Sequence, residues 1–371
     1  MANNSTIEYE YYYEMNGTDE EYCSGEQELI FKSSVQLIFV IIYSIIGFVG
    51  IFSNTFIIII ILSKQEMWNS TNVFICNMAV SDIVISLTAI PLTPLTAFTG
   101  DWYFGKIACV LLPAFQGGSV YISSLSLAAI AVDRYFAMNK SSPAQKNPMN
   151  AWCVVLLIDI ISMALVSPYS CNMELREMKD SRVCMENWSG KFRYVFGVAT
   201  ILVQLVLPVV ISAVAYRKIL VLLQKHSSTL KQNMSKTSHK IQQERQRNKR
   251  RTHILIAILV LFVICWLPLN LINLLEDVGV RLSCWRYYFF LFFCFHILAS
   301  FSVCINPILY GWLNASIREE IEDRLNRLKS VFCAREEHSQ SLELNLVIEG
   351  RITPSMRIRA INAEQNNLNH V

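Results

Sequence analysis

The sequence has little charge and few histidines. Asp, Glu, Lys and Arg make up 16% of its 371 residues, hydrophobic residues make up 53%, and only 6 residues are His. A chain of this length ordinarily forms two or three soluble domains, but soluble domains carry more charge and less apolar surface. The mean hydropathy of +0.36 therefore indicates a membrane protein.

Patterns that mark enzymes and transporters are also missing. His296 is the only His well inside an apolar stretch, and neither a His-x-x-x-His nor a Gly-x-Ser-x-Gly motif occurs. Paired half-repeats with broken helices, which many transporters share, are not apparent. We expect no enzymatic activity, and a membrane transporter remains the less favoured alternative.

Seven continuous apolar stretches are present instead. A spanning helix needs roughly 20 mostly apolar residues, because the hydrocarbon core is about 30 Å thick. Helices are favoured over strands because the stretches do not alternate in polarity and lipid tolerates no unpaired backbone. The predicted spans are residues 35–62, 72–98, 107–135, 151–170, 194–223, 253–275 and 287–312.

The distribution of basic residues predicts the orientation. Residues 1–31 contain no Lys or Arg and many acidic residues, whereas the segment 225–251 between the fifth and sixth spans is rich in Lys and Arg. Basic segments stay on the cytoplasmic side, so the N-terminus is predicted outside and the C-terminus inside. Residues 1–31 show no signal-peptide pattern, so the first span is expected to act as a signal anchor.

Two motifs then indicate a family. Asp133-Arg134-Tyr135 closes the third span, and Asn306-Pro307-Ile308-Leu309-Tyr310 lies in the seventh. Charges at a span are expected only where the helix meets cytoplasm or a protein interior. Asp-Arg-Tyr alone is an ordinary solvated helix end, but the two motifs together resemble those of the rhodopsin-like (class A) G-protein-coupled receptors.

The resemblance implies an all-α membrane protein, namely a seven-transmembrane helix bundle with a short amphipathic eighth helix. The protein is expected in the plasma membrane, multi-pass, with its N-terminus extracellular. Apolar residues at helical spacing from Ile317 to Phe332 also indicate the eighth helix. The expected parts are an acidic extracellular tail at 1–34, the receptor domain at 35–312, the membrane-surface helix at 313–333 and a disordered cytoplasmic tail at 334–371.

The resemblance also assigns roles inside the bundle. Asp82, Ser123 and Ser302 would hold an allosteric sodium ion, the alternative being a water-filled cluster without an ion. Prolines inside spans create hinges. The activation switch would comprise Trp266, Pro268, Tyr216, Asn306, Pro307 and Tyr310, and the residues for G-protein coupling would be Asp133, Arg134 and Tyr135.

Covalent features follow from topology and resemblance together. The family pairs Cys109 with Cys184, whereas Cys23 and Cys284 either form a second disulfide or stay free. Cys333, at the end of the amphipathic helix, is a candidate for palmitoylation. Glycosylation sequons on predicted outer segments begin at Asn3, Asn4, Asn16 and Asn187.

The ligand class is indicated by the third span. Monoamine receptors carry an Asp where this chain has Gln116, seven residues after Cys109, which disfavours an amine ligand. Gln116 resembles the neuropeptide Y and neuropeptide F receptors, and the likeness extends over residues 33–333. The peptide-binding residues would be Thr93, Gln116, Gln204, Asn273, Asp277 and His296.

The chemistry of these residues suits an amidated peptide. Asp277, unless it is merely a solvated helix end, can accept a ligand guanidinium through charge-assisted hydrogen bonds, and the neutral side chains suit a terminal amide. We expect a receptor for an Arg-Tyr-amide or Arg-Phe-amide peptide, the alternative being a tachykinin-like or other RFamide ligand. Expected partners are an inhibitory G protein, arrestin, receptor kinases and membrane lipids, with no nucleic acid and no cofactor beyond the sodium ion.

Two positions depart from the family pattern. Asp159 stands where the family nearly always has Trp in the fourth span, and we expect it to bond Asn77 and Ser126. Asn248 replaces the usual acidic partner of Arg134 at the inner end of the sixth span. Any inner restraint on Arg134 is then expected from Asp133 alone.

Overall fold

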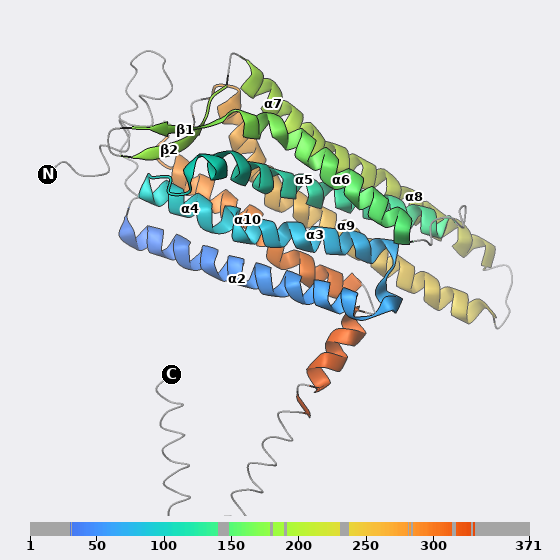
Figure 1. Ribbon diagram of the computed structural model, residues 1–371. Helices are drawn as coiled ribbons and strands as arrows, with labels where there is room; N and C mark the ends of the chain where they lie inside the picture. The colour runs from blue at the N-terminus through green and yellow to red at the C-terminus, as the bar shows by residue number, and fades with distance from the viewer. Residues whose placement is uncertain are drawn as a thin grey trace, which may run out of the picture. The chain divides into compact units, whose positions relative to one another are not determined.

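The computed structural model describes residues 30–330 except 31, 140–147, 179–180, 189–190, 231–236, 281, 283–284, 314–316 and 328. Within that part, 7 segments are long and apolar enough to cross a membrane (Figure 1). The predicted seven-helix bundle is confirmed, and the protein is a multi-pass membrane protein. The spans are Ser33–Ser63, Ser70–Thr99, Gly105–Met138, Asn150–Cys171, Phe192–Gln224, Gln246–Asp277 and Tyr288–Ile308.

The helices and strands follow one another with short connections. The first four spans contain α2 (Ser33–Ser63), α3 (Ser70–Leu87), α4 (Ala89–Thr99), α5 (Gly105–Met138) and α6 (Pro148–Cys171). A hairpin of β1 (Met173–Glu177) and β2 (Arg182–Glu186) precedes the last three. These contain α7 (Phe192–Ile201), the π-helical η3 (Leu202–Val206), α8 (Leu207–Leu230), α9 (Thr237–Asp277) and α10 (Tyr288–Leu313).

The bundle closes because its first and last spans touch. Helix α3 packs against α2, α5 and α6, and α10 packs against both α9 and α2. Gly50 permits a close approach in α2, since a Cβ there would lie 2.5 Å from Ser86 Oγ and 2.8 Å from Val303 Cγ2. Small residues at such contacts let membrane helices approach without a hydrophobic driving force.

Two spans contain breaks that hydropathy did not predict. The second span divides at Thr88, whose hydroxyl donates to the carbonyl of Val84 at 2.6 Å. The fifth span widens into the five-residue π-helix Leu202–Val206 just before Pro208. Such insertions recur at functional sites, and this one contains Gln204, which is only 6% exposed.

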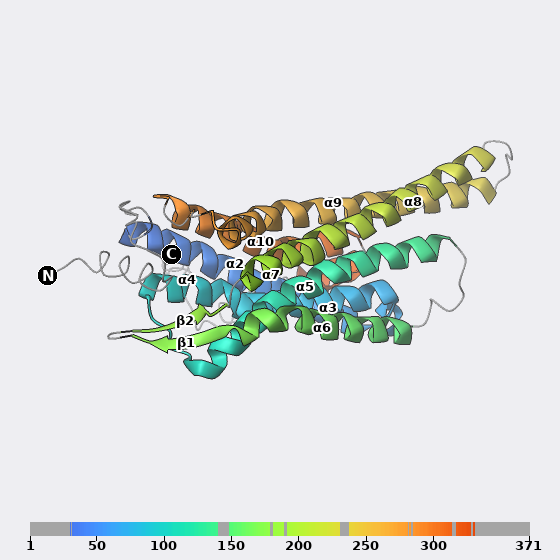
Figure 2. The same ribbon diagram turned by 90° about the horizontal axis from the view of Figure 1, so that it is seen from above.

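The fifth and sixth spans are longer than predicted. Helix α8 continues to Leu230 and α9 begins at Thr237, and both project beyond the other helices in Figures 1 and 2. The basic residues from Arg245 to Arg251 therefore lie on α9 and not in a loop. Gln, Glu, Lys and Arg are good helix formers, so the helix does not stop where its apolar residues stop.

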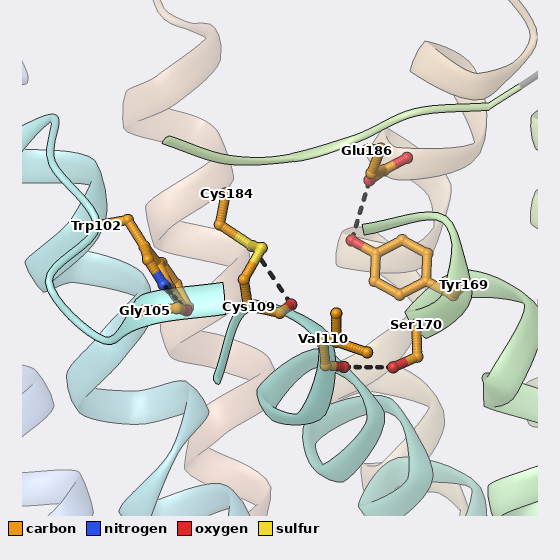
Figure 3. The surroundings of a disulfide bond; sticks show 8 residues. All are labelled: Trp102, Gly105, Cys109, Val110, Tyr169, Ser170, Cys184 and Glu186. Atoms are coloured by element: carbon orange, nitrogen blue, oxygen red, sulfur yellow. Dashed lines mark hydrogen bonds between the residues drawn. A yellow bond between two sulfur atoms is a disulfide. The ribbon is translucent and has the colours of Figure 1, made fainter. Parts of the chain in front are cut away.

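The β1–β2 hairpin lies across one end of the bundle, called the hairpin end below. Cys184 in β2 forms a disulfide with Cys109 near the start of α5, with the two Cα atoms 5.6 Å apart (Figure 3). Asp101 adds a second restraint, because its Oδ1 accepts from the backbone N–H of Arg182 at 2.8 Å and of Trp102 at 2.9 Å. The hairpin is thus fixed to the connection between the second and third spans and to the third span itself.

Residues 317–327 form a further helix within the segment where the eighth helix was expected. Two ion pairs at i,i+4 spacing follow its surface: Arg318 with Glu322 at 3.8 Å and Arg324 with Glu320 at 3.0 Å. The Arg318–Glu322 pair is exposed, and such pairs stabilise a helix modestly, whereas Glu320 is buried. Its contact with a membrane surface stays a prediction.

We predict that Cys109→Ser or Cys184→Ser destabilises the protein by about 2 to 5 kcal/mol, because the bond closes a loop of 75 residues. The measurement is surface expression together with thermal melting. Cys171→Ser is the matched control, since Cys171 is an exposed free cysteine. The double mutant is expected to be no worse than either single mutant; an additive loss would contradict the structural role of the bond.

Candidate functional site

An ion-pair network lies at the hairpin end. Arg193, near the start of α7, donates through Nε to Oδ1 of Asp277 at 2.8 Å, and the same Nε lies 3.4 Å from Oε2 of Glu186 in β2. Asp277 is the last residue of α9. One guanidinium therefore joins the outermost turns of the fifth and sixth spans to the hairpin.

Aromatic side chains hold Glu186 in this network. The Tyr169 hydroxyl donates to Oε1 at 3.0 Å (Figure 3), and Trp188 Nε1 donates to Oε2 at 2.8 Å. Tyr169 is stacked on Phe196 with ring centroids 5.9 Å apart, and Trp188 lies 5.3 Å from the same ring. The carboxylate is thus oriented from two sides by rigid groups.

Two neutral amides lie inside the bundle without internal partners. Gln116 in α5 is half-buried and Gln204 in η3 is buried, and among the described residues neither side chain makes a hydrogen bond. The α5 and η3 segments contact each other. Both amides therefore keep their donors and acceptors available for a ligand.

The remaining predicted peptide-binding residues differ in their surroundings. Thr93 is half-buried in α4, whereas Asn273 in α9 is exposed. His296 in α10 is bonded through Nδ1 to the Tyr43 hydroxyl of α2 at 2.9 Å and is stacked on Phe292. Only its Nε2 is left to meet a ligand.

The predicted switch residues lie in the apolar core. Trp266 is half-buried and packs against Phe262, with ring centroids 6.2 Å apart, and against the clusters of α10. Pro268 lies within α9 two residues later. Asn270 Nδ2 donates to the Trp266 carbonyl at 2.9 Å. A side-chain donor thus adds a bond within the turn that contains the proline.

The predicted sodium residues are buried polar groups on α3, α5 and α10. Asp82 is 1% exposed and accepts from Asn306 Nδ2 at 2.9 Å. Ser123, 4% exposed, lies 2.8 Å from the hydroxyl of Ser81. Ser302 donates to the Ala299 carbonyl and keeps its lone pairs. One carboxylate with several hydroxyl and amide oxygens fits a hard monovalent cation.

The opposite end of the bundle carries the Asp-Arg-Tyr motif. Asp133 accepts from the Thr71 hydroxyl at 3.0 Å, so its carboxylate is held by α3. The Arg134 guanidinium interacts electrostatically with Asp133, with Tyr216 of α8 and with Arg251 of α9. Tyr216 is 3% exposed. No acidic residue on the described part of α9 pairs with Arg134, in agreement with Asn248 at that position.

Asp159 has the first of its two predicted partners. Asn77 Nδ2 donates to Asp159 Oδ1 at 2.9 Å, which confirms the predicted bond between the second and fourth spans. The predicted bond to Ser126 is wrong, because the Ser126 hydroxyl is buried without a partner in the structure. The Asp159 side chain is shorter than that of Trp, and only its bond to Asn77 forms.

The remaining predicted residues lie at the hairpin, within α10 or outside the described residues. Asn187 is exposed at the end of the hairpin, and its side chain donates to Glu174 at 2.8 Å. Pro307 lies within α10, as does Tyr310, whose side chain falls outside the described residues. Also outside them lie Asn3, Asn4, Asn16, Cys23, Cys284 and Cys333.

Sequence reasoning missed Arg193, Glu186 and Tyr43. Arg193 and Asp277 are 84 residues apart, and an Arg at the start of a span is an ordinary interfacial residue. Gly197 offered the available signal, because a Cβ there would lie 2.2 Å from Asp277 Oδ2. A glycine inside a span permits such a close approach by another helix.

Comparison with known proteins agrees with this arrangement. The model of the family described as 7 transmembrane receptor (rhodopsin family) matches residues 53–310, so the chain belongs to the rhodopsin-like, class A G-protein-coupled receptors. Neuropeptide receptor npr-1 of Caenorhabditis elegans is 31% identical over 323 residues, covering 76% of this chain and 71% of that relative. Neuropeptide Y receptor type 2 is 28% identical over 337 residues in both Cavia porcellus and Homo sapiens, covering 86% of each chain.

We predict that Asp159→Ala lowers the stability of the receptor by about 0.5 to 2 kcal/mol, the usual range for hydrogen bonds between membrane helices. Asp159→Asn keeps an oxygen acceptor for Asn77 and is expected to lose less. Thermal melting of the ligand-free receptor measures both changes. An Asn77→Ala background should remove most of the difference between the two variants, and an unchanged difference would contradict the pairing.

Proposed function

We propose that this receptor responds to an amidated neuropeptide that carries Arg before an aromatic C-terminal residue, of the Arg-Tyr-amide or Arg-Phe-amide kind. The peptide would bind from the extracellular side at the hairpin end, with the receptor in the plasma membrane and its N-terminus outside. The printed names of the relatives, a neuropeptide receptor and neuropeptide Y receptors, support this class of ligand.

The observation that carries the proposal is the environment of Asp277. Its side chain is only 17% exposed and already holds a guanidinium in a 2.8 Å bond. A carboxylate in such a place favours a planar cation that offers directed donors, as a peptide arginine does. A solvated helix end would need no such partner.

The neutral amides supply the second requirement. A C-terminal amide is uncharged, so it needs both a donor and an acceptor and no cation. Gln116 and Gln204 lie deeper than Asp277 along their spans and make no hydrogen bond among the described residues. The aromatic terminus would lie above Trp266, within reach of His296 Nε2.

Signalling would follow from a shift between two states of the bundle. Pro208, Pro268 and Pro307 provide hinge points in the fifth, sixth and seventh spans. Opening of α9 would let Arg134 meet a heterotrimeric G protein of the inhibitory type, with Tyr216 and Tyr310 turning toward it. Arrestin and receptor kinases would act on the same cytoplasmic side, where Cys333 would be palmitoylated. Asn3, Asn4, Asn16 and Asn187 would be glycosylated outside.

The cluster around Asp82 would bind a sodium ion in the inactive state. Asp82, Ser123 and Ser302 would be its ligands, and the ion would compensate a carboxylate that is 1% exposed. Asn306 would remain bonded to Asp82 while the ion is present. The ion would therefore stabilise the inactive packing of α3, α5 and α10.

The test of the proposed function is a screen of amidated peptides ending in Arg-Phe-amide and Arg-Tyr-amide on cells that express this chain, read as G-protein activation. The free-acid forms are the matched controls and are expected to fail, because a carboxylate finds no cation beside Gln116. A response only to amidated tachykinin-like peptides would instead identify the alternative ligand class, and no response to any of them would refute the proposal.

We predict that Asp277→Ala weakens the active peptide by about 2 kcal/mol, at the lower end of the 2 to 5 kcal/mol that truncating a buried charge pair costs. The lower end is expected because Arg193 already neutralises Asp277. Competition binding with the peptide and with its citrulline analogue measures the effect. The substitution should reduce the affinity of the citrulline analogue much less than that of the arginine peptide. Equal losses of affinity for both ligands would exclude the Arg–Asp277 contact.

We predict that Arg134→Ala leaves peptide affinity within about tenfold, or 1.4 kcal/mol, and removes G-protein activation. Arg134 and Gln116 are 18 residues apart on α5, or about 27 Å, so the ligand is coupled to Arg134 only through the state of the bundle. Peptide binding and nucleotide exchange are measured on the same membranes. Retained exchange at normal surface expression would overturn the assigned role.

A further inference from the structure

The carboxylate expected to take a ligand arginine is already occupied by an arginine of this chain. Arg193 bonds Asp277 at 2.8 Å and lies 3.4 Å from Glu186. One cation therefore lies between two carboxylates that come from α9 and β2. A peptide arginine that reaches Asp277 meets this internal guanidinium first.

The three side chains are unequally exposed. Arg193 is 45% exposed, whereas Asp277 is 17% and Glu186 is 25% exposed. Arg193 is thus the most accessible of the three side chains to a ligand.

The backbone around the pair is shaped for this contact. Arg193 and Gly197 are four residues apart in α7 and share a helix face. A Cβ on Gly197 would meet Asp277 Oδ2 at 2.2 Å. The missing side chain lets the Asp277 carboxylate lie directly against α7, beside the Arg193 side chain.

We propose that Arg193 is a specificity-determining residue of the ligand site. Its guanidinium is paired with the Asp277 carboxylate until the guanidinium of a ligand replaces it. The inference rests on the proposed function. An uncharged ligand group that displaced Arg193 would leave a largely buried carboxylate unpaired, which is strongly unfavourable. An ammonium offers a point charge without the planar fork of donors. A guanidinium exchanges for Arg193 with little loss.

Glu186 has a positioning role in this exchange. Tyr169 and Trp188 hold its carboxylate in place, and Arg193 Nε is already 3.4 Å from it. When a ligand takes Asp277, Arg193 turns to Glu186, so its charge stays paired. Glu186 therefore favours ligand binding without touching the ligand.

The first experiment measures binding of an Arg-Phe-amide peptide and its citrulline analogue. Arg193→Gln is expected to raise the affinity of the arginine peptide by about five- to tenfold, since an internal competitor for the pair with Asp277 is removed. The affinity of the citrulline analogue should rise by no more than about twofold. Lys191→Gln is the matched control: Lys191 is exposed, lies two residues before Arg193, and carries the same charge.

The second experiment is a double-mutant cycle. Glu186→Gln is expected to weaken the arginine peptide by about threefold or more, and the effect should disappear in the Arg193→Gln background. A merely structural loss at Glu186 would persist in both backgrounds and affect both peptides alike. The arginine-to-citrulline affinity ratio is therefore the readout that separates the two roles.

The third experiment needs no peptide. Arg193→Ala leaves room for a small guanidinium, so millimolar methylguanidinium should raise its melting temperature by about 2 °C or more, whereas methylammonium should not. The parent receptor and the Arg193→Ala/Asp277→Asn double mutant are expected not to respond. An equal response in all three proteins would overturn the assignment of the site.

The outcomes separate the two proposals. If methylguanidinium stabilises Arg193→Ala but no amidated peptide binds the parent, the guanidinium site stands and the proposed function fails. If the peptide binds but Arg193→Gln leaves its affinity unchanged or weaker, the proposed function stands and the role of Arg193 is refuted.

Discussion

The absence of water in the hydrocarbon core is the constraint on which the rest of this structure depends. Backbone groups there must be paired within the chain, so each crossing is helical, and side chains add bonds near the irregular turns. Thr88 supplies a hydroxyl at the break in the second span, and Asn270 supplies an amide beside Pro268. The same constraint explains why Asp82 and Asp159 each have an amide partner, Asn306 and Asn77.

Polar chemistry is consequently concentrated in three levels of the bundle. The hairpin end holds the Glu186–Arg193–Asp277 network, the middle holds the Asp82 cluster, and the far end holds Arg134 with Asp133. Apolar packing around Trp266 separates the first two levels. A conformational change at one level can affect another only through changes in helix packing, because no chain of hydrogen bonds among the described residues connects the levels. Pro208, Pro268 and Pro307 lie within the helices, and a proline allows a helix to bend.

The seven crossings were predictable because length and hydropathy determine them, and the Asn77–Asp159 bond was predictable because a carboxylate inside a span needs a partner. Hydropathy carries no information on the backbone hydrogen bonding within a helix. Neither the break at Thr88 nor the π-helix around Gln204 was therefore foreseen. Hydropathy also ends each span where apolar residues end, which placed the start of α9 too late. Arg193 was missed for a different reason: its partner lies 84 residues away, and such a pairing exists only in three dimensions.

The continuity of α9 has a mechanical consequence. The helix runs unbroken from Thr237 to Asp277, with Pro268 much nearer to the hairpin end. Taking Pro268 as a pivot, Asp277 lies about 14 Å from it and Arg245 about 35 Å from it on the other side, at 1.5 Å per residue. The two arms have a length ratio of about 2.5, so if α9 pivots at Pro268, a small sideways displacement of Asp277 would become a displacement more than twice as large, in the opposite direction, at the basic turns beyond the bundle.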